Sequence, residues 1–94
     1  MSNQHSTFRR WFDKKMDSDT RRCIREYGVA ATAPRGLIFY SETTALYRLY
    51  KEEIWEIVLD CCGGSISDLI KKHDLNDPVL FENWMVWAAA EIIA

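Results

Sequence analysis

The sequence has few of the residues that interrupt helices, with four glycines and two prolines among 94 residues. It has no apolar run longer than the seven residues from Trp84 to Ala90. Because a helix needs about 20 apolar residues to cross a bilayer, we expect no membrane-spanning segment. The first residues, Met1 to His5, lack the apolar stretch of a signal peptide, so we expect a cytoplasmic protein.

Signatures of catalysis and of metal binding are also missing. The three cysteines, Cys23, Cys61 and Cys62, form no CxxC motif; we expect reduced thiols, with Cys61 a small core residue. Of the two histidines, His5 falls in residues 1–6, which we expect to be a frayed tail, and His73 has too few partners for a catalytic relay or a four-ligand zinc site. Neither phosphate-loop nor dinucleotide-binding glycine spacing occurs. We predict no catalytic residue, no metal, no cofactor and no enzyme activity.

Apolar residues are plentiful. They make up 48% of the chain and include four Trp, four Tyr and four Phe, which is enough to form a core without disulfides. A chain of this length has room for one domain, so we predict a single domain over residues 1–94.

Helical signals cover most of that domain. Apolar spacing over 7–27 predicts one bent helix or two short ones, with Ser18 as a cap for the second and Gly28 as the stop. A helix over about 42–62 would be capped by Ser41 and stopped by Gly63 and Gly64. On it, one arc carries Leu46, Tyr47, Tyr50, Ile54, Ile57, Val58 and Cys61.

The rest of the chain adds two helices. Ser65 and Asp68 resemble a capping box that opens a short helix through about Lys72. Asp77 and Pro78 give a cap and a first-turn proline for a last helix toward Ala94. The prediction is an all-α, compact bundle of four to five helices, with the helices at 42–62 and 78–94 in its centre.

The last helix has apolar residues on most sides, so it is either central to the core or completed by a second subunit, which leaves a homodimer open. Its more polar side carries Asn83, Trp87 and Glu91, spaced four apart. Trp87 is either buried by a neighbouring helix or a candidate anchor for a partner.

Charge is unevenly distributed along the chain. Residues 1–36 carry eight basic and four acidic residues, whereas residues 37–94 carry four basic and ten acidic residues. A candidate partner-binding acidic face consists of Glu52, Glu53, Glu56 and Asp60, which would repel DNA, imitate it toward a DNA-binding protein, or keep the surface hydrated. A candidate nucleic-acid surface, or a merely solvated one, consists of Arg10, Lys14, Arg21 and Arg25.

Two stretches carry a family resemblance. Residues 36–47 read Gly-Leu-Ile-Phe-Tyr-Ser-Glu-Thr-Thr-Ala-Leu-Tyr and are followed by Glu53-Ile54-Trp55. The C-terminal stretch, Phe81 to Ala94, contains Val86-Trp87-Ala88-Ala89-Ala90-Glu91, a Val-Trp-x-Ala-x-Glu pattern. Both stretches resemble a family of small phage-encoded proteins in which an aromatic pair precedes Ser-(Asp/Glu)-Thr. The resemblance implies a phage or prophage accessory protein in the bacterial host cytoplasm. It favours a host-directed binder, a class that includes anti-CRISPR-type inhibitors of host defence.

The leading hypothesis is therefore a non-enzymatic protein that binds and inhibits a host protein complex, such as a CRISPR or other defence effector. Two alternatives remain: a helical accessory protein that binds nucleic acid through its basic N-terminal helix, and a homodimer with a structural or regulatory role.

Overall fold

The computed structural model describes residues 7–29 and 40–94, and within them the chain forms five α-helices and no strand. Along the chain these are α1 (Phe8–Lys15), α2 (Ser18–Tyr27), α3 (Tyr40–Cys62), α4 (Ile66–His73) and α5 (Pro78–Ile93). The predicted all-α bundle of four to five helices is confirmed. The expected tail at 1–6 and the segment before Tyr40 lie outside the described residues.

Most of the predicted helix ends are confirmed. Ser65 and Asp68 form a reciprocal capping box, and Asp77 accepts a hydrogen bond from the Leu80 amide ahead of Pro78. The prediction of Ser18 as the cap of α2 was wrong by one residue, because Asp17 accepts the hydrogen bond from the Thr20 amide at 2.8 Å. A carboxylate also suits the positive end of the helix dipole better than a hydroxyl does.

The predicted cap Ser41 was wrong. Helix α3 begins at Tyr40, so Ser41 is already its second residue. The end of α3 at Cys62, followed by Gly63 with a positive φ of 74°, agrees with the predicted stop.

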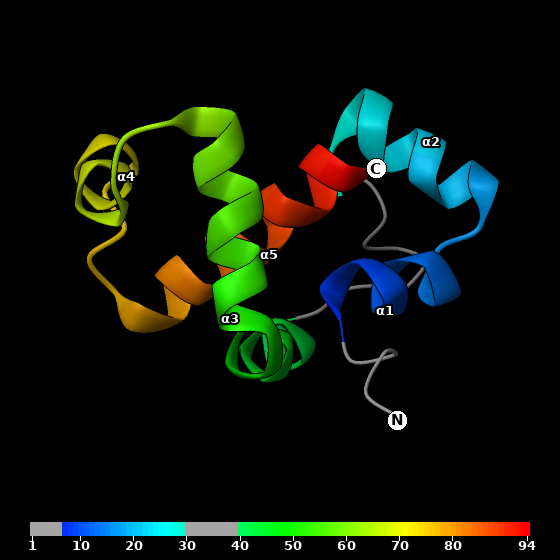
Figure 1. Cartoon of the computed structure of the whole chain (residues 1–94), viewed down its shortest axis with the longest axis horizontal. Coiled ribbons are helices and arrows are strands. Elements are labelled where there is room, and N and C mark those ends of the chain that lie inside the picture. The colour runs from blue at the N-terminus through cyan, green and yellow to red at the C-terminus, as the bar shows by residue number, and fades with distance from the viewer. Residues whose placement is uncertain (1–6, 30–39) are drawn as a thin grey trace.

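Helices α3 and α5 form the main packing interface, as predicted (Figure 1). Helices α1 and α2 lie on one side of this pair and α4 lies on the other. The apolar character of the middle of α5 is explained by its position, since Met85, Val86, Ala89 and Ala90 are fully buried. Val79, Leu80 and Ile92, nearer its ends, are exposed. Within the described residues, no helix combines the length and apolarity needed to span a bilayer.

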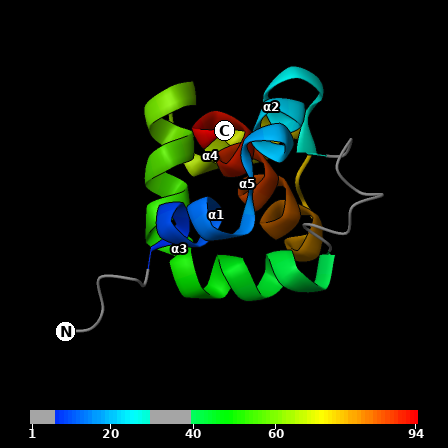
Figure 2. The same cartoon turned by 90° about the vertical axis from the view of Figure 1, so that its right-hand side faces the viewer.

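Helix α3 is bent at Tyr50, whose backbone angles (φ −123°, ψ 26°) are not helical. Figure 2 shows its two arms, 40–49 and 51–62, running in different directions around α5 and α1. The indole N–H of Trp55 donates to the Tyr47 hydroxyl at 2.8 Å, which joins the arms across the bend. No proline or glycine occurs between Tyr40 and Cys62, so the bend comes from tertiary packing rather than from a helix-breaking residue.

Most residues of the arc of α3 that was predicted to be buried are buried in the structure. Leu46, Tyr47, Ile54, Ile57 and Val58 are buried as expected, and Tyr50 is half-buried. The placement of Cys61 in the core was wrong, because this residue lies in the last turn of α3 beside the exposed residues 62–64 and is itself exposed.

A buried polar pair fixes the first arm of α3 on α5. The Thr43 hydroxyl is fully buried and donates to the side-chain carbonyl of Asn83, which is 6% exposed. A buried amide is costly unless it is hydrogen-bonded, so this pair favours one register of the two helices.

We expect Thr43→Val and Asn83→Leu each to lower the free energy of unfolding by about 1–3 kcal/mol, since each leaves its partner without this bond. The double variant should lose less than the sum of the two, which urea unfolding of all four proteins would measure. Strict additivity would show that the pair is not coupled.

A second prediction concerns the pKa of the Tyr47 phenol, which absorbance can follow. Burial raises its pKa above the ordinary value of 10.0; the Trp55 hydrogen bond lowers it and the nearby charge of Glu82 raises it. Because folding favours the neutral phenol, the contribution of Tyr47 to stability is complete below pH 10 and is lost as pH rises through the folded-state pKa. In an alkaline titration at 295 nm, the component removed by Tyr47→Phe should have its midpoint above pH 10; a midpoint at or below 10 would contradict the burial effect.

Candidate interaction surfaces

Three residues of the predicted acidic face form a stripe on the second arm of α3. Glu52, Glu56 and Asp60 are spaced four apart and exposed, and none of them forms an ion pair with another described residue. We call these three residues the acidic stripe. Carboxylates four apart on one helix repel one another, so the stripe is an unfavourable arrangement that a cationic partner would relieve.

The fourth predicted member, Glu53, has a different role. Its Oε1 accepts from the Phe8 amide at 2.6 Å, and its Oε2 accepts from the Arg9 amide at 3.2 Å and from the Arg9 guanidinium at 3.3 Å. These amides are at the N-terminus of α1, where helical N–H groups have no partner within the helix. Glu53 therefore binds α1 to the bend of α3 and is only 20% exposed.

The predicted anchor stripe on α5 is occupied by contacts within the chain. Asn83 binds Thr43, and Trp87 is half-buried against the core. The Glu91 carboxylate accepts from the Val29 amide at 3.0 Å. Gly28 also approaches it: a Cβ at Gly28, whose φ is +90°, would lie 3.2 Å from Glu91 Oε2. The stripe thus holds α3 and the end of α2 against α5.

The predicted basic surface contains two residues that bind other parts of the chain and two that are exposed. Arg21 pairs with Asp13 at 2.5 Å and donates to the Ile93 carbonyl at 3.4 Å, while Arg25 donates to the Ala94 carbonyl at 3.2 Å. Cations at the C-terminal end of a helix bind its free carbonyls and suit its dipole. Arg10 and Lys14 remain exposed and form no ion pair with the described part of the chain.

No chemical centre is assembled from the cysteines and histidines. In residues 7–29 and 40–94, no three His, Cys, Asp or Glu side chains lie close enough to hold a metal ion. The His73 ring lies against the Trp84 ring of α5 at a tilt of 33°, with ring centroids 4.6 Å apart, and so helps to pack α4. The predictions of no cofactor and no enzyme activity remain predictions.

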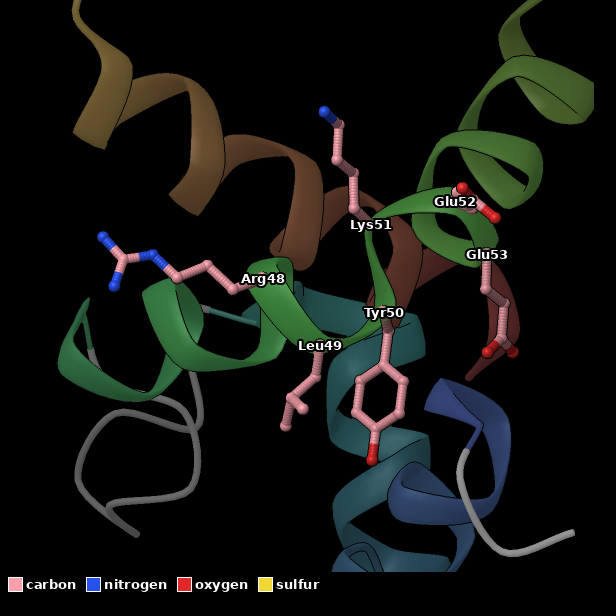
Figure 3. Close-up of a pocket in the computed structure, with 6 residues that line it drawn as sticks. All are labelled: Arg48, Leu49, Tyr50, Lys51, Glu52 and Glu53. Carbon is pink, nitrogen blue, oxygen red and sulfur yellow. The ribbon is translucent and has the colours of Figure 1, made fainter. Parts of the chain in front are cut away.

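Sequence reasoning missed a groove at the bend of α3. It has a volume of about 500 Å³ and is lined by Arg48, Leu49, Tyr50, Lys51, Glu52 and Glu53 (Figure 3). The groove depends on the bend, and no residue type in the sequence marks the bend. The available signal was Leu49, an apolar residue that falls outside the predicted buried arc of its helix.

Comparison of the chain with protein-family models, with curated proteins and with solved structures gave no match.

The two roles of the α3 carboxylates can be separated by mutation. We expect Glu53→Ala to lower the free energy of unfolding by about 1–2 kcal/mol, because it removes the acceptor for two helix N-terminal amides. The matched control Glu56→Ala, on the same arm but exposed, should change it by less than about 0.5 kcal/mol. Equal effects in chemical denaturation would contradict the assignment of Glu53 to α1.

Proposed function

We propose that the chain is a phage or prophage accessory protein that binds a host protein complex and inhibits it, without catalysis, in the bacterial cytoplasm. A CRISPR or other defence effector is the target class that the family resemblance suggests. The proposed contact surface is the acidic stripe. The observation that carries this proposal is that Glu52, Glu56 and Asp60 are exposed and without a cationic partner among the described residues, whereas Glu53 is bound by Arg9 and α1.

The chemistry of the stripe selects the class of partner. A row of carboxylates on a rigid helix attracts a basic protein surface and repels the phosphates of nucleic acid. Effectors that handle nucleic acid have basic channels for phosphates, and a carboxylate row would compete for such a channel. Inhibition would then follow from occupation of that surface, with no chemical step.

The two alternatives have less support. A nucleic-acid surface would rely on Arg10 and Lys14, because Arg21 and Arg25 are directed to the end of α5. The homodimer was motivated by the apolar last helix. Burial within one chain accounts for the middle of α5, whereas Val79, Leu80 and Ile92 toward its ends are exposed.

The proposal is tested by charge reversal. Glu52→Lys/Glu56→Lys should reduce capture of a protein partner from a nuclease-treated bacterial host lysate by at least about tenfold at low salt. The control Asp19→Lys/Glu26→Lys applies the same change of charge to exposed residues of α2 and should leave capture unchanged.

Mass spectrometry of the retained proteins names the target, and an activity assay of that target tests inhibition. Undiminished capture by the stripe variant would exclude the stripe as the contact. Retention of nucleic acid alone, lost with nuclease or salt, would favour the surface around Arg10 and Lys14 instead.

A further inference from the structure

The groove at the bend of α3 contains an unusually exposed apolar side chain. Leu49 is 70% exposed, close to Tyr27 (74%) and more than Val79 (54%), Leu80 or Ile92. Single exposed apolar residues are common on protein surfaces and need no explanation by themselves. Leu49 and Tyr27 each line a hollow of the surface, but only the hollow at Leu49 also contains Glu52, a residue of the acidic stripe.

Two of the side chains that line the groove, Tyr50 and Glu53, are held by α1. Figure 3 shows the side chains of Leu49, Tyr50 and Glu53 directed to the same side of the bend, while Arg48 and Lys51 point elsewhere. Tyr50 packs against Phe8 of α1, with ring centroids 6.2 Å apart, and Glu53 is held by the α1 amides. The walls nearest α1 are therefore set before any partner arrives, which lowers the entropic cost of binding.

The groove is also continuous with the acidic stripe, because Glu52 belongs to both. The nearest cation on the second arm, Lys51, lies over the Trp55 ring at 4.9 Å and is directed away from the stripe. The exposed apolar side chain of Leu49 thus lies near a row of carboxylates that starts at Glu52 and extends along the arm. This order of apolar and acidic groups is complementary to a segment with an apolar side chain followed by basic residues.

We propose that the bend groove is the anchoring site for a basic polypeptide segment of the partner, which places one apolar side chain against Leu49 and its cationic groups along the acidic stripe. The inference rests on the proposed function and adds the kind of segment that is bound. Charge complementarity favours this occupant over an acidic peptide or nucleic acid, which the stripe would repel.

The test places the photo-crosslinking residue p-benzoylphenylalanine at position 49 of the full chain, with position 79 as the exposed control. After irradiation in nuclease-treated bacterial lysate, the adduct is digested and the attached peptide is sequenced. The expected adduct forms at position 49 and not at position 79, and it contains a host segment with an apolar residue beside several Lys or Arg. An acidic segment, a second copy of this chain, or equal yields at both positions would overturn the proposal.

Binding of a synthetic peptide with the sequence of the crosslinked segment completes the test. Leu49→Ser should weaken that binding about tenfold or more even at high salt, since it removes a buried leucine contact, whereas Val79→Ser should not change it. Glu52→Lys/Glu56→Lys should weaken it mainly at low salt. Unchanged binding by Leu49→Ser would overturn the anchor.

The two proposals fail in distinguishable ways. Partner capture that is lost on charge reversal, with no adduct at position 49, overturns the groove and leaves the acidic stripe as the contact surface. Capture that survives charge reversal, with no basic adduct, overturns both.

Discussion

The bend of α3 at Tyr50 is the constraint on which the other contacts depend. It lets Thr43 in the first arm bind Asn83 of α5 while Ile54 and Val58 in the second arm are buried in the same core. It also presents Tyr50 and Glu53 together to the first turn of α1. Had α3 continued straight, its two arms would not both follow α5 and α1 as they do in Figure 2. The groove beside Leu49 is a by-product of the same change in direction.

The sequence predicts the helices well because their signals are local. Capping by Ser65 and Asp77, the proline at position 78 and the positive-φ glycines after α2 and α3 each act within a few residues. The central position of α5 could also be predicted, since a helix with apolar residues on most sides must be covered on most sides. The bend could not, because it results from packing between residues far apart in the chain and no proline or glycine marks it.

The candidate sites were harder to predict because a polar residue looks the same in sequence whether it faces a partner or another helix of the chain. Glu53 and Glu52 are adjacent, yet one binds α1 and the other is exposed. Arg21 and Arg10 were placed on one arc, yet only Arg21 reaches the end of α5. In each case a long-range contact decides the role, and only the arrangement of the helices reveals it.

Sequence separation between contacting residues affects the order in which the helices pack together. Helices α3, α4 and α5 are consecutive, and their packing requires only the short α4 connection to close. Helices α1 and α2, in contrast, are attached by hydrogen bonds between residues 45 to 72 positions apart, from Phe8 to Glu53 and from Arg21 to Ile93. Closing a long loop costs conformational entropy, which must be offset by the contacts that the loop closure forms. The N-terminal pair is therefore the natural unit to detach first in partial unfolding, while α3 and α5 stay together.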